Sequence, residues 1–196
     1  MTPVRGVEHI PWLYDAGMAV CERLGMHRWR EALVDGVRGR VLEVGCGTGR
    51  TLPLYPAETA VWAVDPDAAA LRRARRRAPQ VPLYVGRAEA LPFADGSFDT
   101  VTTSLSFCSV GDTAAGLREI RRVLDDHGVL RMLEHVRSPG LAGRVQDRIQ
   151  PVWTAVSGGC HLNRDTEAAV RAAGFRIDGT SRRARGVMRC FAAYKA

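Results

Sequence analysis

The chain has 196 residues, of which 46% are hydrophobic and 25% are charged. This length and composition predict one globular domain with a sizeable core over residues 1–196, and they exclude large-scale disorder. The formal net charge of +7 leaves nucleic acid, anionic lipid and acidic substrates open as partners.

The first residues and the cysteines bear on the compartment. No apolar run is long enough to cross a bilayer, and the N-terminus lacks the basic start and apolar block of a secretory signal. The cysteines are odd in number, widely spaced and without a CxxC pair, so we expect neither a metal site nor a disulfide framework. They are Cys21, Cys46, Cys108, Cys160 and Cys190. A reduced, cytoplasmic protein is expected.

Apolar runs alternate with helical patterns along the first half of the chain. Residues 41–44 form a short predicted strand, and residues 48–55 begin a predicted helix that Pro56 ends. A second strand covers residues 60–64. It is followed by a helix that contains the arginine cluster of residues 71–77, which we interpret as a solvated helix face, with nucleic-acid binding as the alternative.

The alternation continues through the middle of the chain. Strands are predicted over residues 81–85 and 98–103, and apolar residues then recur at helical spacing over residues 114–124. A turn at residues 126–128 leads into a fifth strand over residues 129–133. Strands that alternate with helices indicate a mostly parallel sheet with helices on both faces.

The end of the chain has a different pattern. Residues 175–181 and 187–194 are predicted strands joined by a short turn, so they must be antiparallel. Before them, an apolar helical stripe over residues 141–149 is interrupted by Pro151, and Asn163 is expected to cap the following helix.

The stretch VLEVGCGTG, residues 41–49, contains the most informative motif. A strand, a glycine-rich turn and a helix together predict a nucleotide or anion site. The spacing is not that of a phosphate loop, because Glu43 precedes Gly45, Gly47 and Gly49 and would repel a pyrophosphate. The next strand ends at Asp65, where a carboxylate can accept hydrogen bonds from ribose hydroxyls.

These residues resemble the class I S-adenosylmethionine-dependent methyltransferases. The resemblance implies an α/β Rossmann-like sheet of seven strands in the order 3-2-1-4-5-7-6, with strand 7 antiparallel. It implies that the glycine turn passes the amino-acid part of S-adenosylmethionine and that Asp65 holds its ribose. The segment of residues 86–93 is similar to the adenine side of ubiquinone-type methyltransferases, but it has Arg87 where those carry Asp, which favours Ala88 and Glu89 as contacts.

The resemblance therefore implies a set of cofactor-binding residues: Glu43, Gly45, Cys46, Gly47, Gly49, Asp65, Pro66, Ala88, Glu89, Ser104 and Tyr14. Residues 1–39 would add a helical cap in which Trp12 and Tyr14 line the site or simply pack.

Four later blocks, at residues 105–110, 133–136, 151–153 and 159–164, occur in the same order in the methyltransferase-like seven proteins, which are thiol S-methyltransferases. This narrower resemblance favours a thiol as the methyl acceptor. The chain lacks the N-terminal membrane anchor of the human members, so no anchor is expected.

His135 follows the fifth predicted strand and is the candidate catalytic residue, as a general base or an orienter of the acceptor; a structural histidine at a strand end is the alternative. Residues 137–163 are expected to form a lid over the acceptor. Trp153, Cys160 and Arg164 are candidate substrate residues, although Cys160 and Cys108 are also suited to packing and Arg164 to pairing near the next helix.

A small-molecule acceptor is expected, with neither nucleic acid nor a metal. Three other functions stay open: carbon or oxygen methylation of a quinone or polyketide-like ring, amine methylation of a phospholipid, and binding of S-adenosylmethionine without catalysis. The sequence fixes neither the acceptor nor the oligomeric state.

Overall fold

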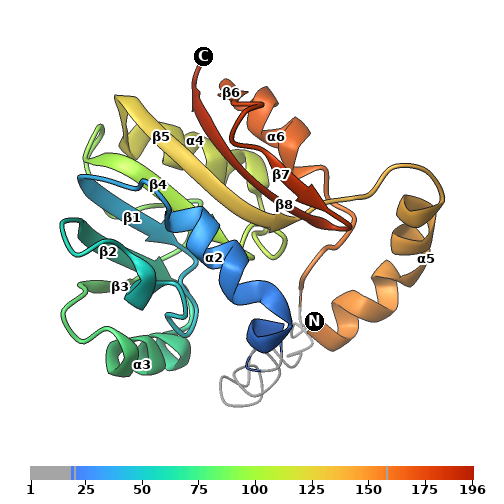
Figure 1. Ribbon diagram of the computed structural model, residues 1–196, viewed down its shortest axis with the longest axis horizontal. Coiled ribbons are helices and arrows are strands. Elements are labelled where there is room, and N and C mark those ends of the chain that lie inside the picture. Colours follow the sequence, from blue (N-terminus) through green and yellow to red (C-terminus); the bar gives the residue numbers. More distant parts are fainter. Residues whose placement is uncertain (1–18, 20, 158) are drawn as a thin grey trace.

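The computed structural model describes residues 19, 21–157 and 159–196, and its centre is one mixed β-sheet (Figure 1). The strands are β1 (Arg40–Val44), β2 (Ala60–Asp65), β3 (Leu83–Val85), β4 (Phe98–Ser104), β5 (Leu124–His135), β6 (Phe175–Ile177), β7 (Arg183–Arg185) and β8 (Met188–Lys195). Their order is β3-β2-β1-β4-β5-β8-β6, and β7 pairs with β8 outside this path.

The predicted topology is confirmed. Strands β3, β2, β1, β4 and β5 are parallel, whereas β8 runs antiparallel to both β5 and β6. The short β7 adds one strand to the numbering, so β8 takes the place of the predicted seventh strand. Because β1, β2, β4 and β5 are parallel, their last residues all lie at one carboxyl edge of the sheet, which is where α/β sheets bind their ligands.

The described helices and helical turns are η2 (Glu22–Met26), α2 (His27–Val34), η3 (Leu52–Leu54), α3 (Ala68–Arg77), α4 (Thr113–Val123), α5 (Gly140–Ser157) and α6 (Thr166–Ala172). Helix α2 crosses the front of the sheet in Figure 1, and α4 and α6 lie behind it, while α5 stands apart from the sheet on the right. None of the described helices combines the length and the apolar character that a membrane crossing requires.

The core consists of two main layers, one on each face of the sheet, because neighbouring residues of a strand point to opposite faces. On β1, Leu42 and Val44 pack into the layer beneath α4 and α6, whereas Val41 packs with Leu71 and Ala74 of α3. Glu43 therefore shares its face with Val41, on the side of the sheet that α2 and α3 cover.

Two elements that precede α5 differ from the prediction. The predicted helix over residues 48–55 is only the single turn η3, because Gly47 and Gly49 have positive φ angles and Pro53 lacks an amide hydrogen. Strand β5 begins at Leu124, before the predicted turn at residues 126–128; the chain accommodates that turn as an irregularity within the strand, where the pairing register with β4 shifts.

Three elements of the second half also differ. Helix α5 continues through Pro151, which costs one backbone hydrogen bond but does not end this surface helix. The N-cap of α6 is Asp165, whose side chain accepts from the amide of Ala168 at 3.0 Å, and not Asn163. The predicted strand over residues 175–181 ends at Ile177. A separate strand, β7, pairs antiparallel with β8, and a tight turn joins these two strands.

Candidate active site

The glycine turn follows β1 at the carboxyl edge. Gly45, Gly47 and Gly49 all have positive φ angles. A Cβ atom at Gly45 would lie 2.3 Å from the Cβ atom of Ser106, and one at Gly49 would lie 2.8 Å from that of Ala74, so both positions require close packing. Among residues 19, 21–157 and 159–196, nothing lies within 4 Å of a Cβ atom placed at Gly47. The turn is thus packed on both sides and open over Gly47.

Asp65, the last residue of β2, holds the open part of this turn. Its Oδ2 accepts from the amide of Gly47 at 2.7 Å, and its Oδ1 accepts from the amide of Asp67 at 2.9 Å. Burial raises the pKa of the Asp65 carboxyl, and the two backbone donors oppose that rise. Each carboxylate oxygen has a second lone pair, so Asp65 can accept further hydrogen bonds from a ligand.

Glu43 lies beneath the turn in a buried polar network. Its Oε2 accepts from the hydroxyl of Tyr55 at 3.1 Å, and that hydroxyl is 2.6 Å from Oγ1 of Thr102. Burial raises the pKa of Glu43 to about 7, against the lowering effects of the Arg30 charge and of the Tyr55 hydrogen bond. Glu43 therefore faces the protein interior, where its ionised form is held by specific partners.

Arg30 supplies the positive charge of this network from helix α2. Its Nη1 donates to Oγ1 of Thr51 at 3.0 Å and to Oγ of Ser104 at 2.6 Å, and its Nε donates to Glu22 at 2.9 Å. The side chain is buried, so the charge is shielded little by solvent. Arg30 was not predicted as a site residue. Its partners are distant in the chain, so no local sequence pattern marks a lone arginine in a predicted helix.

The other predicted cofactor residues lie along the same edge. Ala88 is buried in the core, and Oε1 of Glu89 accepts from the amide of Asp112 at 3.3 Å. Cys46 is buried in the turn, whereas Pro66 is exposed beside the end of β2. Trp12 and Tyr14 fall outside the described residues.

The loop after β4 is held by the buried carboxyl of Glu134 and by the half-buried side chain of Arg164. Oε1 of Glu134 accepts from Thr103 Oγ1 at 2.9 Å and from the amides of Ser106 and Phe107 at 3.3 and 3.1 Å. Nη1 of Arg164 donates to the carbonyl oxygens of Phe107 and Val110 at 2.7 and 2.6 Å. Arg164, a candidate substrate residue, thus holds the loop through this nitrogen.

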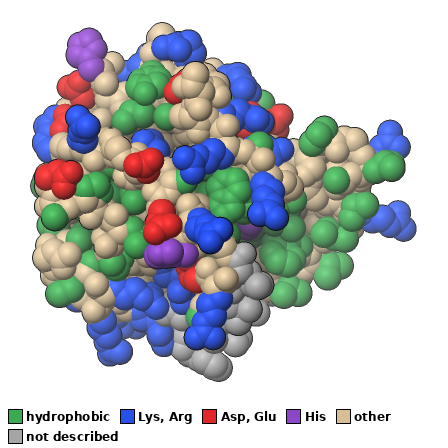
Figure 2. Space-filling model, viewed as in Figure 1, with side chains coloured by type: hydrophobic (Ala, Val, Ile, Leu, Met, Phe, Trp, Pro, Cys, Tyr) green, Lys and Arg blue, Asp and Glu red, His purple; other side chains and the backbone are tan. Residues whose placement is uncertain are grey.

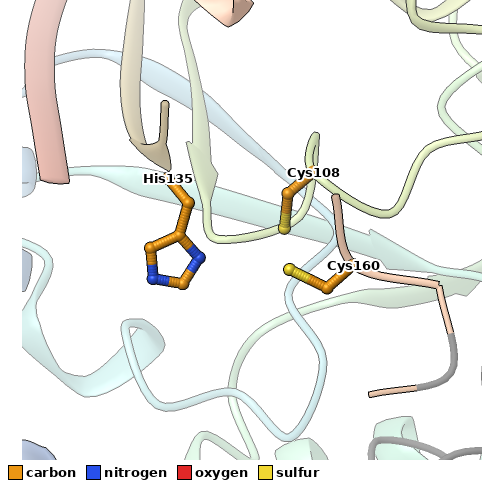
Figure 3. A group of neighbouring side chains, drawn as sticks. All are labelled: Cys108, His135 and Cys160. Carbon is orange, nitrogen blue, oxygen red and sulfur yellow. The ribbon is translucent and has the colours of Figure 1, made fainter. Parts of the chain in front are cut away.

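Three side chains meet beyond this loop, at the ends of β4 and β5. Cys108, His135 and Cys160 each place one nitrogen or sulfur atom within 4.8 Å of the other two (Figure 3). The two sulfur atoms interact, which raises the pKa of the Cys108 thiol and lowers that of the Cys160 thiol. Nδ1 of His135 is buried and has no hydrogen-bond partner among the described residues. The structure therefore brings the candidate catalytic histidine together with a candidate substrate residue.

Helix α5 extends beyond this cluster and contributes Trp153, whose side chain reaches Cys160 and contributes to lowering its pKa. Figure 2 shows hydrophobic side chains gathered over this part of the molecule. The exposed ones on α5 are Leu141, Val145, Ile149, Val152, Trp153 and Val156. The predicted apolar stripe exists, but most of it is exposed.

Comparison with known proteins places these features in a family. Residues 42–132 match the family described as Methyltransferase domain. Human thiol S-methyltransferase TMT1B is 36% identical over 142 residues, which are 67% of this chain and 58% of that protein. The demethylmenaquinone methyltransferase of Renibacterium salmoninarum is 37% identical over 126 residues, which are 62% of this chain and 53% of that protein. The chain thus spans less than two thirds of either relative.

Among solved structures, a Thermotoga maritima protein described as a SAM-dependent methyltransferase and possible histamine N-methyltransferase aligns with a TM-score of 0.75. The alignment covers 97% of this chain and 99% of that one at 21% sequence identity. At this identity the likeness establishes the shared fold.

Proposed function

Because the chain belongs to the class I S-adenosylmethionine-dependent methyltransferases, we propose that it transfers a methyl group from S-adenosylmethionine to a small-molecule thiol. The observation that carries this proposal is the pairing of an open glycine turn with a buried, unpartnered His135 nitrogen on the same edge of the sheet.

The glycine turn fits S-adenosylmethionine. The space over Gly47 is open, and Asp65 beside it keeps lone pairs that ribose hydroxyls could use. Glu43 and Arg30 form the floor beneath the turn, where Glu43 accepts a hydrogen bond from Tyr55 and interacts with the Arg30 charge. When bound, S-adenosylmethionine supplies a methyl group that is electrophilic because its sulfur is a sulfonium.

The protein has two tasks on the acceptor side, namely to ionise the acceptor and to hold it in line for attack. A thiol has an ordinary pKa near 8.5 and reacts as the thiolate, so a group that removes its proton speeds the reaction. We propose that His135 removes this proton. Helix α5 and Trp153 offer an apolar surface for the acceptor's carbon skeleton, and we propose that residues 137–163 act as its lid.

Methylation of a quinol ring is the second candidate, and the match to a demethylmenaquinone methyltransferase favours it. A carbon or oxygen acceptor would occupy the same edge and would use the same cofactor residues. The thiol is preferred because a thiol S-methyltransferase matches a larger share of the chain. The free cysteines of the described chain are compatible with a reducing compartment such as the cytosol.

The test is incubation with methyl-labelled S-adenosylmethionine and matched panels of thiols, phenols, quinols and amines, with mass spectrometry of the products. We expect labelled thioethers. Labelled quinol products without thioethers would show that the acceptor is a quinol ring. Binding of S-adenosylmethionine without any labelled product would show that the chain binds the cofactor without catalysis.

A further inference from the structure

The cluster of Cys108, His135 and Cys160 has a use beyond packing, and we propose that it binds a zinc ion. Each residue comes from a different part of the fold: Cys108 from the loop after β4, His135 from the end of β5, and Cys160 from the segment after α5. Two thiolates and one imidazole form a donor set that zinc prefers. The sequence did not predict this site, because the three residues are distant in the chain and show no metal-binding spacing.

The distances suit one ion. The three donor atoms lie within 4.8 Å of one another. Zinc binds sulfur at about 2.3 Å and imidazole nitrogen at about 2.0–2.1 Å, so two ligands of a tetrahedral site are roughly 3.5–3.8 Å apart. At most, the present separations exceed these by about 1.0–1.3 Å, a difference that rotation of the three side chains can reduce.

His135 supplies an independent reason to expect a ligand. Its Nδ1, the ring nitrogen directed toward the two sulfur atoms in Figure 3, is buried and makes no hydrogen bond of ordinary geometry among the described residues, although the proximity of His135 contributes to lowering the pKa of the Cys160 thiol. A buried polar atom without a partner is costly and calls for an explanation such as an ion. Coordination of a cation by Nδ1 would satisfy it.

The backbone that carries the two cysteines is already fixed. The amide of His161 donates to the carbonyl oxygen of Cys108 at 2.9 Å. The amide of Cys160 donates to Oγ of Ser157 at 3.2 Å, and its carbonyl oxygen accepts from Nε2 of Gln150 at 3.0 Å. Gln150 is buried on α5, so the helix that supplies the proposed lid also positions one metal ligand.

Three protein ligands leave one of the four zinc positions open, as in catalytic zinc sites. Resting on the proposed function, we assign this position to the acceptor thiol. The acceptor would bind as a thiolate, forming a zinc–sulfur bond and releasing its proton to solvent, and His135 would then act as a zinc ligand in place of a proton acceptor. Cys108 and Cys160 would likewise release their protons when the ion binds. A thioether product carries no negative charge and is a weaker ligand, so it would leave.

The experiment is a cobalt(II) titration of the phosphine-reduced full chain, without cofactor or acceptor, followed by zinc competition. We expect one equivalent to bind, with thiolate-to-cobalt charge-transfer absorption that zinc abolishes. Cys108→Ser, Cys160→Ser and His135→Ala should each weaken the affinity at least tenfold. The matched controls Cys21→Ser and His127→Ala, at exposed positions outside the cluster, should bind as the unaltered chain does.

Circular dichroism of every variant separates loss of a ligand from loss of the fold. Absence of the charge-transfer absorption in the reduced, folded chain would overturn the proposal, and so would equal binding by all three ligand variants. Because neither cofactor nor acceptor is present, metal binding without methyl transfer would refute only the proposed function, and methyl transfer without metal binding would refute only the zinc site.

Discussion

At the ends of β1 and β2, the carboxylates of Glu43 and Asp65 accept hydrogen bonds from Tyr55 and from the amides of Gly47 and Asp67. At the end of β5, by contrast, Oε2 of Glu134 and Nδ1 of His135 are buried and have no partner among the described residues. The carboxylates of the first region, which we propose as the cofactor site, already accept hydrogen bonds from the protein. The second retains unsatisfied polar atoms, which is what an acceptor or an ion would require.

The two regions also differ in their surroundings. The glycine turn is enclosed by α3 and by the loop after β4, whereas the cysteine–histidine cluster adjoins α5, whose apolar side chains are exposed. Substitutions at the first region should therefore alter cofactor affinity and stability, and substitutions at the second should alter acceptor chemistry. The four predictions below test this division.

The largest effect is expected for His135→Ala. It should slow methylation of a high-pKa alkanethiol by roughly 10²–10⁴-fold and affect an acidic thiophenol far less, because the latter ionises unaided. Steady-state kinetics of both acceptors gives the comparison, with His127→Ala as the matched control. Equal losses for both acceptors would show that His135 only orients or packs. A proton acceptor and a zinc ligand give the same pattern, and the metal titration distinguishes them.

The second prediction concerns stability and pH. Burial raises the pKa of Glu43 to about 7 from its ordinary value of 4.5, so the folded chain binds this proton more tightly than the unfolded chain. The resulting stabilisation is complete below pH 4.5 and is lost as the pH rises through 7, with a total of about 3 kcal/mol.

Glu43→Gln should remove this part of the pH dependence, because glutamine does not titrate. The free energy of unfolding in urea, measured below pH 4.5 and above pH 7, gives this pH dependence. Glu58→Gln, at an exposed position, is the control. An unchanged pH dependence in Glu43→Gln would contradict the assigned pKa. Glu134, whose pKa burial also raises to about 7, should contribute in the same direction.

Asp65→Ala should weaken the binding of S-adenosylmethionine. A hydrogen bond to a charged group contributes roughly 1.5–3 kcal/mol, which corresponds to a tenfold to hundredfold loss of affinity. Calorimetry measures it, and Asp126→Ala, which removes an exposed carboxylate that pairs with Lys195, serves as the control. Unchanged affinity in the Asp65 variant would remove this residue from the cofactor site.

The smallest effect is expected on α3. Arg72 and Arg76 are exposed and lie away from the carboxyl edge, so the double change Arg72→Gln and Arg76→Gln should leave methyl transfer unaltered. Any binding of duplex or single-stranded nucleic acid should be weak and should fall steeply with salt. Tight, sequence-selective binding that the double change abolishes would reopen nucleic acid as a partner.

The sequence predicted the features that depend on neighbouring residues. The alternation of strands and helices and the glycine turn follow from local patterns, whereas the order of the strands in the sheet followed from the family resemblance; the structure confirms the sheet order and the positive φ angles of the turn. The predictions that Pro151 interrupts its helix and that Asn163 caps the next one were wrong. In both cases the local preference of the residue was outweighed by the rest of the fold.

Contacts between distant segments were not predictable. Arg30 reaches Thr51 and Ser104 only after α2 packs on the sheet. Cys108 and Cys160 meet His135 only because the loop after β4 and the segment after α5 converge on one edge. The sequence therefore indicated individual residues on both sides, but not that Cys108, His135 and Cys160 form one cluster.

Methyl transfer to sulfur can be measured directly by letting a thiol and a quinol compete for the methyl group in one vessel. The chain is given ¹³C-methyl S-adenosylmethionine with equal amounts of a small apolar thiol and a quinol, and nuclear magnetic resonance identifies the atom that carries the labelled methyl group. We predict that the label appears on sulfur and that His135→Ala reduces it. Label on quinol carbon or oxygen, with none on sulfur, would contradict this account.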